Sequence, residues 1–258
     1  MPDAEAGRAL AQTQAFTIER LTGDTGSSFA FASLTECILL LPGIGAALSG
    51  DRNVQLPGKA AVIVPRGSYS LELAGPSEVY ILSTDRSDLD GAGAPARDER
   101  VRTVGAPRRR ITGDGEVHIH PIADIPIPPD NGRLRFLRSQ TMSINWVEYD
   151  GVRDRGGLSP HAHADFEQAS LAIEGEFVHH LRTPWGRNAD LWRDDAHVTA
   201  GPASVIVIPP EIIHTTEGVG TGRHILVDVF APPREDFIAR NWVFNAEEYA
   251  LSLEDAEA

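Results

Sequence analysis

The stretch SPHAHADFEQASLAIEGEFVHHL, residues 159–181, decides how this chain is interpreted. His161 and His163 are two positions apart, so their side chains project from the same side of an extended segment. The apolar run that follows contains Gly175 and predicts two strands joined by a turn. Imidazole nitrogens are ligands for zinc, nickel, copper and iron. The stretch therefore predicts a metal site on β-structure.

A third histidine completes the candidate ligand set. His214 follows the strand-like run ASVIVIPP, residues 203–210, about fifty residues after the histidine pair. Together the three histidines could form a facial set around one divalent ion on the wall of a barrel. The next ligand is either Glu167 or Gln168, because strand alternation lets only one of two neighbours point inward. The apolar periodicity of residues 169–173 leaves this choice open.

Short apolar runs separated by turns continue along most of the chain and indicate an all-β sandwich or barrel. Strands are predicted in CILLLPG (37–43), AAVIVPRG (60–67), SLELAG (70–75), EVYILS (78–83), LAIEGEFVHHL (171–181), ASVIVIPP (203–210) and RHILVDVFAPP (223–233). Helical periodicity is confined to PREDFIARNW (233–242) and NAEEYALSLEDAEA (245–258).

A weak internal repeat indicates that the two halves are copies of one fold. Residues 56–73 and 199–218 both carry a glycine, an apolar run and a proline corner. Aligning Pro65 with Pro209 puts Ser70 opposite His214, so the first copy lacks the histidine.

The halves are separated by a segment of different composition. Residues 86–116 contain few large apolar side chains and are interpreted as a linker or long surface crossover. We therefore predict a first module with its linker over residues 1–110 and a metal-binding module with a C-terminal tail over residues 111–258.

Composition excludes several classes of function. The 258 residues carry a formal net charge of −14, which argues against nucleic acid and anionic membranes as partners. Lys59 is the only lysine and is expected in a turn, and Cys37 is the only cysteine and is expected to be free and buried. The start of the chain has no apolar core of a signal peptide, and no run reaches the ~20 apolar residues of a membrane helix. A cytoplasmic protein is expected.

These motifs resemble the cupin superfamily. Its first motif places a Glu after a His-x-His pair and a Gly six residues beyond that position, and its second motif is matched by Gly201, Pro209 and His214. Glu211 stands where the second motif has Gly, and Gly218 where it has Asn. The resemblance implies an all-β bicupin, two double-stranded β-helix (jelly-roll) barrels with the N-terminal one degenerate, and metal inside the second.

The motif register selects between the two candidate ligands. Six residues separate Gln168 from Gly175, so the register puts the amide at the ligand position and not Glu167. The run HAHADFEQ is also similar to that of the pectin-degradation cupins that linearise unsaturated uronates, in which the Gln binds the metal. The implied metal ligands are His161, His163, Gln168 and His214, and the metal is one divalent ion, Zn, Ni, Fe or Mn.

The same resemblance implies two catalytic or substrate-binding residues in the closing run DVFAPPREDF. These are Asp228, as general base or acid, and Arg234, as a carboxylate-binding fork. A metal held only by neutral ligands keeps its full charge, acts as a strong Lewis acid and attracts an anionic substrate.

The expected function is that of a metal-dependent enzyme acting on a small oxygenated, carboxylated metabolite, as a sugar-acid isomerase, ring-opening enzyme or lyase. The alternatives are an iron- or nickel-dependent dioxygenase and a non-catalytic small-molecule-binding cupin. The expected partner is a small, anionic substrate, and a homodimer is a further possibility.

The remaining histidines and two tryptophans are weaker candidates. His118 and His120 form a second His-x-His that is expected to begin the second module. Of His179 and His180, one is expected to line the pocket. Trp185 and Trp192 either cover the pocket or, preferably, pack on the other module, and His197 and His224 are expected to be structural or on the surface.

Overall fold

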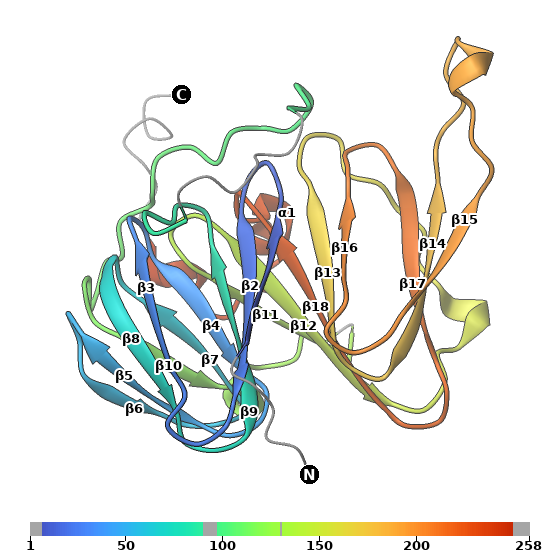
Figure 1. Cartoon of the computed structure of the whole chain (residues 1–258). Helices are drawn as coiled ribbons and strands as arrows, with labels where there is room; N and C mark the ends of the chain where they lie inside the picture. Colours follow the sequence, from blue (N-terminus) through green and yellow to red (C-terminus); the bar gives the residue numbers. More distant parts are fainter. Residues whose placement is uncertain (1–6, 90–96, 130, 250–258) are drawn as a thin grey trace.

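The computed structural model describes residues 7–89, 97–129 and 131–249. Within them the chain forms four β-sheets, and its single α-helix is α1 (Glu235–Ala239). Short 3₁₀ turns occur at η1 (Ile122–Asp124), η2 (Arg155–Gly157), η3 (Ala189–Leu191) and η4 (Ala246–Glu248). Figure 1 shows the first half of the chain on the left and the second half on the right.

The first half contains two sheets. One has the order β1 (Gly7–Gln12), β2 (Thr17–Gly23), β9 (Ser77–Ser83), β4 (Cys37–Leu41), β7 (Ala60–Val64), β10 (His118–Pro121). The other has the order β3 (Ser28–Ser33), β8 (Gly67–Leu73), β5 (Ala46–Gly50), β6 (Val54–Leu56). All the strand pairs in these two sheets are antiparallel.

The second half also contains two sheets. One has the order β11 (Leu134–Arg138), β12 (Ser143–Asp150), β18 (Arg223–Phe230), β13 (Gln168–Glu174), β16 (Val205–Ile208). The other has the order β15 (Ala196–Ala200), β14 (Glu176–Arg182), β17 (Ile213–Val219). No sheet in the described part of the chain closes on itself, so each half is a pair of facing sheets.

Three apolar clusters lie between these layers. Side chains from both sheets of the first half fill its interior completely, with Leu39, Val62, Leu71 and Ile81 fully buried. The second cluster joins the two halves through the opposite faces of their central sheets. The third, inside the second half, contains only four buried side chains. The second half is therefore the one with interior space for a site.

Each predicted run contains or overlaps an observed strand, and β8, β9 and β13 begin one to three residues before the expected run. The fold is all-β, as expected. The helix expected over 233–242 is shorter, at Glu235–Ala239, and that expected over 245–258 is a 3₁₀ turn at Ala246–Glu248, its remainder lying outside the described residues. Ten strands of the described residues lie outside the expected runs, including β12 (Ser143–Asp150), whose sequence SINWVEYD mixes polar and apolar side chains and has no continuous apolar run.

One strand lies in the other half from the one expected. β10 pairs with β7 of the first half, so His118 and His120 extend that sheet instead of beginning the second module. The side chain of His118 contacts the Gly113 carbonyl, and His120 packs edge-on against Phe244. The module boundary between residues 110 and 111 itself stays a prediction.

The alignment of the two halves is shifted by one residue. β8 and β17 occupy corresponding places, but Ser70 lies on the outer face of β8, where its hydroxyl contacts Ser28. Tyr69 faces the interior instead and is 4% exposed. The inward position that corresponds to His214 is therefore Tyr69 and not Ser70.

The long insert after β14 forms an arm. The β14–β15 hairpin projects away from the first half (Figure 1). Trp185 and Trp192 stack on each other near its tip, with ring centroids 4.4 Å apart, and Trp185 is 72% exposed. The expected packing on the other module is therefore wrong, because the hairpin holds both rings outside the body of the protein.

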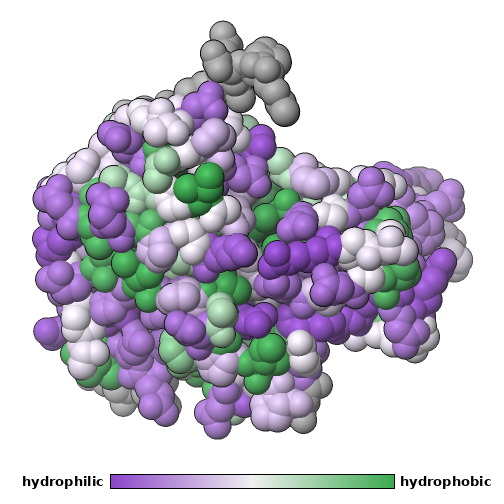
Figure 2. Space-filling view, turned by 90° about the horizontal axis from the view of Figure 1, so that it is seen from below, coloured by the Kyte–Doolittle hydropathy of each residue, from purple (hydrophilic) through white to green (hydrophobic). Residues whose placement is uncertain are grey.

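On the face of the molecule drawn in Figure 2, small and separate hydrophobic patches lie among hydrophilic residues.

Two expectations about single residues are confirmed. Lys59 has a positive φ of 55° in the turn before β7. Cys37 is a free, fully buried cysteine. In the described part of the chain no helix has the length and apolar character needed to cross a membrane.

Candidate functional site

Three histidines converge inside the second half. His161 and His163 lie on the segment before β13, and His214 lies on β17. Their candidate ligand nitrogens all lie within 4.8 Å of one another. His161 and His214 also exchange two backbone hydrogen bonds, with N···O distances of 3.0 and 2.8 Å, which attach the segment to β17. This backbone bridge holds together histidines that are about fifty residues apart in the sequence.

Backbone carbonyls orient two of these rings. The Nδ1–H of His161 donates to the Ser159 carbonyl and that of His214 to the Ile212 carbonyl, both at 2.9 Å. A neutral imidazole with its proton on Nδ1 keeps a free electron pair on Nε2. Such outer hydrogen bonds are how metal-binding histidines are held in proteins.

Gln168 lies against the same histidines. Its Oε1 is 2.9 Å from the Nε2 of His163 and 3.2 Å from the Nε2 of His214. Its amide nitrogen donates to Ser170 Oγ at 3.0 Å and to Asp228 Oδ1 at 2.9 Å, so the orientation of the amide is fixed. Because the ring proton of His214 is on Nδ1, its Nε2 carries an electron pair and faces the Gln168 oxygen, so two hydrogen-bond acceptors lie against each other. A cation between these electron pairs would relieve that contact, so the donor set fits a divalent metal.

Glu167 points in the opposite direction. Its carboxylate accepts a hydrogen bond from the backbone N–H of Gln14 at 2.9 Å. Ala169, Leu171 and Ile173 share this side of the strand and pack in the cluster between the two halves. The apolar side of β13 therefore faces the first half, and the side with Gln168 and Ser170 faces the interior.

Burial keeps two of the histidines neutral. Desolvation lowers the pKa of His163 to about 3 and that of His214 to about 4, from an ordinary value of 6.5. A neutral imidazole is the form that binds a metal ion. The electron pairs on these two rings are therefore available at neutral pH.

Asp228 lies next to the amide of Gln168. Its Oδ1 accepts hydrogen bonds from Ser170 Oγ at 2.6 Å and from the Gln168 amide, and its Oδ2 has only a long contact of 3.4 Å with Asn145. Burial raises the pKa of the Asp228 carboxyl, although these hydrogen bonds oppose the change. The carboxyl thus has one anchored oxygen and one freer oxygen beside the histidines.

Arg234 lies just before α1 and is enclosed by aromatic rings. Its guanidinium lies 4.9 Å from the ring centre of Phe166, 5.2 Å from that of Phe230 and 4.0 Å from that of Phe237. Its Nε and Nη2 donate to the two carboxylate oxygens of Asp236 at 2.7 and 2.6 Å. The fork expected to hold a substrate carboxylate is therefore occupied by a carboxylate of the same chain.

A cavity of about 480 Å³ joins these groups. It is lined by His161, Gln168, His214, Asp228 and Arg234. Its volume lies in the range of small-molecule sites. The structure thus brings together all the site residues expected from the sequence. His163 alone among them does not line the cavity, because it lies behind Gln168 and contacts its side chain.

Sequence reasoning missed several residues of this cavity. Asn145 and Tyr149 on β12 line it, as do Arg133, Arg153 and Arg240. The alternation of SINWVEYD would have placed Asn145 and Tyr149 on one face of a strand. The arginines lie in or beside irregular segments, where no periodic signal exists.

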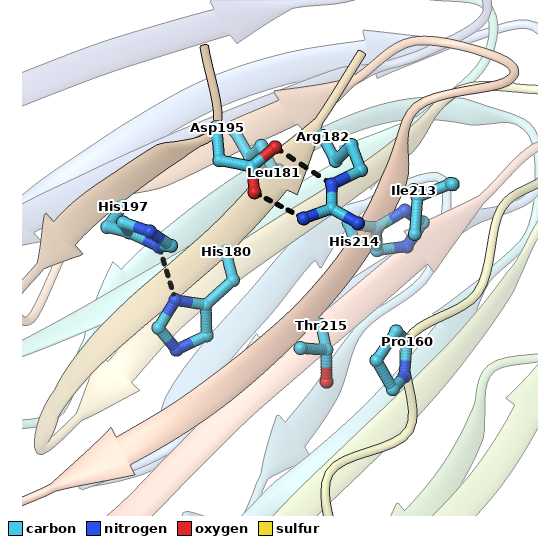
Figure 3. Close-up of a pocket in the computed structure, with 9 residues that line it drawn as sticks. All are labelled: Pro160, His180, Leu181, Arg182, Asp195, His197, Ile213, His214 and Thr215. Carbon is cyan, nitrogen blue, oxygen red and sulfur yellow. Dashed lines mark hydrogen bonds and ion pairs between the residues drawn. The ribbon is translucent and has the colours of Figure 1, made fainter. Parts of the chain in front are cut away.

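A second cavity lies on the outer face of the β14–β15–β17 sheet (Figure 3). Arg182 pairs with both oxygens of Asp195, at 2.9 and 2.6 Å. The two Nδ1 atoms of His180 and His197 are 2.7 Å apart, and the Nε2 of His180 contacts Glu217 at 3.1 Å. Four polar side chains of this cavity, Arg182, Asp195, His180 and His197, therefore bind one another in pairs.

Of the remaining histidines, His179 and His224 are both buried in the second half, and neither lines the cavity that holds Asp228. His179 is 1% exposed, its Nδ1 contacts Thr216 Oγ1 at 3.0 Å, and its Nε2 has no hydrogen-bond partner among the described residues. His224 is buried against Tyr149 and has a structural role, whereas His197 is exposed.

Two departures from the second motif have local explanations. Glu211 has a φ of +69°, a conformation that favours glycine, which explains why the motif has Gly there. Its carboxylate forms an ion pair with Arg100 at 2.6 Å on the surface. At Gly218, a Cβ would lie 2.1 Å from the hydroxyl of Tyr149, so the aromatic ring occupies the space that a larger residue would need.

Comparison with solved structures identifies the fold. AerE from Microcystis aeruginosa matches with a TM-score of 0.60 and 9% identity, covering 90% of this chain and 93% of that one. A variant of oxalate decarboxylase from Bacillus subtilis matches with a TM-score of 0.60 and 10% identity over 88% and 75% of the two chains. A cupin 2 conserved barrel domain protein from Leptotrichia buccalis matches with a TM-score of 0.53 and 10% identity over 90% and 91%.

The chain therefore has the cupin fold. A further structure of the Bacillus enzyme, with a TM-score of 0.57 and 9% identity over 88% and 75% of the chains, is described for its Mn(II) centres. No family description and no curated protein matches this sequence. The fold and the histidine triad define a cupin-fold protein whose site is suited to a divalent metal.

Proposed function

We propose that this chain is a metal-dependent cupin enzyme acting on a small, oxygenated and carboxylated metabolite such as a sugar acid. The reaction class is isomerisation, ring opening or elimination. The observation that carries the proposal is the position of Asp228. Its carboxyl is hydrogen-bonded to Gln168, whose other amide atom contacts two histidines, and both residues line one cavity.

The ligands of the metal would be His161, His163, His214 and Gln168. Imidazole and amide ligands carry no charge, so the ion would keep its own charge and polarise a substrate carbonyl or hydroxyl oxygen. Glu167 is excluded from the set because its carboxylate faces Gln14.

Asp228 would transfer the proton. The raised pKa of its carboxyl brings it closer to the pH at which a carboxyl can both accept and return a proton. Ser170 and Gln168 fix Oδ1, so Oδ2 is the atom that would meet the substrate. Arg234, held by Asp236 and three aromatic rings, would line the cavity on the side of α1 and contact the bound substrate there.

We further propose a bicupin architecture, a first substrate to test and a cytoplasmic location for the protein. Two facing sheets in each half, with corresponding strands β7–β8 and β16–β17, support a bicupin whose first copy is degenerate. The similarity to pectin-degradation cupins supports an unsaturated uronate as the first substrate to test. A cytoplasmic location accords with the single free cysteine.

Metal analysis of protein purified without a metal-binding tag tests the ligand set. We expect near-stoichiometric metal in the wild type and in Glu167→Ala, and a strong loss in His163→Ala and Gln168→Ala. Glu167→Ala is the matched control, because it removes the neighbouring side chain on the opposite face of the strand. Loss of metal in Glu167→Ala with retention in Gln168→Ala would refute the neutral ligand set.

Activity assays of the metal-loaded protein test the reaction class. A panel of uronates and related keto acids, assayed without oxygen, should show turnover that falls by at least 10²-fold in Asp228→Asn. An absolute requirement for O₂ would favour an iron- or nickel-dependent dioxygenase. Tight ligand binding without turnover would favour a non-catalytic binding protein.

A further inference from the structure

The cavity beside the histidines has a positive lining, although the chain has a formal net charge of −14. Arg133, Arg153, Arg234 and Arg240 line it, against two aspartates, Asp228 and Asp236. Arg234 is paired with Asp236 by two hydrogen bonds. The arginine predicted from the sequence to bind the substrate is thus largely neutralised within the chain.

The other three arginines of the cavity have no such carboxylate partner among the described residues, and one of them, Arg240, packs against Trp242 with its guanidinium 5.0 Å from the ring centre. In residues 7–89, 97–129 and 131–249, neither Arg133 nor Arg153 forms an ion pair with a carboxylate. Asp154, the neighbour of Arg153, accepts a hydrogen bond from the backbone N–H of Gly156. Several other arginines are paired with carboxylates, for example Arg86 with Glu19 and Arg223 with Glu148.

The position of Arg153 is fixed by the chain around it. Its backbone N–H donates to the Gly218 carbonyl at 3.1 Å, and its Nη2 donates to the Gly157 carbonyl at 2.9 Å. Its Nε is buried and has no hydrogen-bond partner in the part of the chain that the structure describes. A buried donor without a partner costs about 1–3 kcal/mol, more for a charged group, and an acceptor supplied by a ligand would remove that cost.

Arg133 lies over the same wall of the cavity. Its guanidinium is 5.8 Å from the ring centre of Tyr149, which also lines the cavity. Guanidinium groups bind carboxylates and phosphates through two parallel hydrogen bonds. Arg133 and Arg153 therefore supply the charge and donors of an anion site at the β11–β12 side of the cavity.

The wall between this pair and Asp228 is polar. Asn145 lines the cavity and donates weakly to Asp228 through its amide nitrogen, and its buried Oδ1 has no hydrogen-bond partner within the described ranges. A substrate hydroxyl would satisfy that oxygen. The lining thus matches a hydroxylated compound with an anionic group.

We infer that Arg153 and Arg133 form an oxyanion subsite that binds the anionic group of the substrate, separate from Arg234. The substrate class is a small polyhydroxylated acid whose carboxylate or phosphate lies against these two arginines while its reacting carbon lies near Asp228. This inference rests on the proposed function for the identity of the bound compound as a substrate, but the anion site can be measured without turnover.

Isothermal titration with inorganic phosphate and with acetate tests the subsite. The titrations use the metal-loaded protein and the same protein after chelation, so that anion binding to the metal is distinguished from binding to the arginines. We expect the dissociation constant of the chelated protein to rise at least 10-fold in Arg153→Gln and in Arg133→Gln, and less in Arg153→Lys. Binding of phosphate alone would indicate a phosphorylated substrate, and of both anions, a carboxylate site.

Arg155→Gln is the matched control. Arg155 lies two residues from Arg153, is 76% exposed and pairs with Glu217 at 3.4 Å outside the cavity lining. It should leave anion binding unchanged. Anion affinity that is the same in Arg153→Gln and the wild type, or absent from the wild type, would overturn the inference.

The metal content of each variant separates the two proposals. If Arg153→Gln retains the metal and loses anion binding, the results support both the proposed metal-dependent function and the anion subsite. If the wild type contains no metal but its anion affinity depends on Arg153, the subsite stands and the proposed function fails. If the metal depends on Gln168 while anion affinity does not depend on Arg153, only the subsite fails.

Discussion

At the residue scale, the choice between two neighbours sets the charge of the candidate metal site. Gln168 donates to Asp228 through its amide nitrogen while its oxygen faces the histidines. In Gln168→Glu a second carboxylate oxygen would lie about 3 Å from Asp228, and like charges at that distance destabilise each other. We expect metal-free Gln168→Glu to lose about 2 kcal/mol of stability at pH 8 and less at pH 5, where a shared proton relieves the repulsion.

Denaturant unfolding at the two pH values measures this effect. Glu167→Gln is its control, since it exchanges the same groups on the side of the strand that faces Gln14. If Gln168→Glu is as stable as the wild type at pH 8, the side chain at position 168 does not lie against the Asp228 carboxylate, and the prediction is contradicted.

The buried histidines predict how stability depends on pH. The pKa of His163 is lowered to about 3 and that of His214 to about 4, whereas both return to about 6.5 in the unfolded chain. As pH falls below 6.5 the unfolded chain binds protons first, so the metal-free protein loses stability between about pH 6.5 and 4, by at most about 1.4 kcal/mol per pH unit for each histidine.

Thermal unfolding of the chelated protein across this range measures the dependence. His163→Gln should flatten the curve, whereas His197→Gln, which removes an exposed imidazole, should leave its slope unchanged. A wild-type curve that is flat from pH 6.5 to 4 would contradict the burial of neutral histidines.

At the element scale, the turn between β16 and β17 carries His214 into place. Glu211 has a φ of +69° there, and its backbone N–H donates to the His163 carbonyl. A non-glycine residue in this conformation costs about 1 kcal/mol. We therefore expect Glu211→Gly to be about 1 kcal/mol more stable than Glu211→Ala, with the ion pair to Arg100 lost in both.

Chemical denaturation of the two variants provides the comparison. Because both lack the carboxylate, the difference isolates the backbone. Equal stabilities would mean that the turn relaxes to another conformation when the side chain is removed, and the position of His163 should then change as well.

At the scale of the whole molecule, one apolar cluster makes the two halves dependent on each other. Leu171 of β13 and Ile63 of β7 are both fully buried in the cluster that joins them. We expect Leu171→Ala and Ile63→Ala each to cost about 2–5 kcal/mol and to lower the temperature of a single calorimetric transition. Neither should change the metal content of the folded protein, because Leu171 faces away from the cavity.

Val207→Ala supplies the control on the neighbouring strand, because Val207 is 38% exposed. It should change stability by no more than about 0.5 kcal/mol. Two separate calorimetric transitions, with only one displaced in each variant, would show that the halves unfold independently.

The sequence alone determined the all-β class, eight of the 18 strands in the described residues and the histidines of the candidate site. It could do so because strand periodicity, turn residues and imidazole spacing are local features of the chain. The resemblance to cupins added the register that favours Gln168. Local pattern did not reveal β10 in the first half, because a strand carries no mark of the partner with which it pairs.

Only the tertiary structure decided which side of β13 faces the interior. Ala169, Leu171 and Ile173 are the more apolar side, yet they face the other half, and the interior receives Gln168 and Ser170. The reason is that a strand between two layers is covered on both faces, so apolar side chains do not identify the inside of one half. The tertiary structure also showed that Asp236 pairs with Arg234. It showed in addition that Arg133 and Arg153 line the cavity without an ion pair in the described residues, which depends on how the sheets pack and not on local sequence.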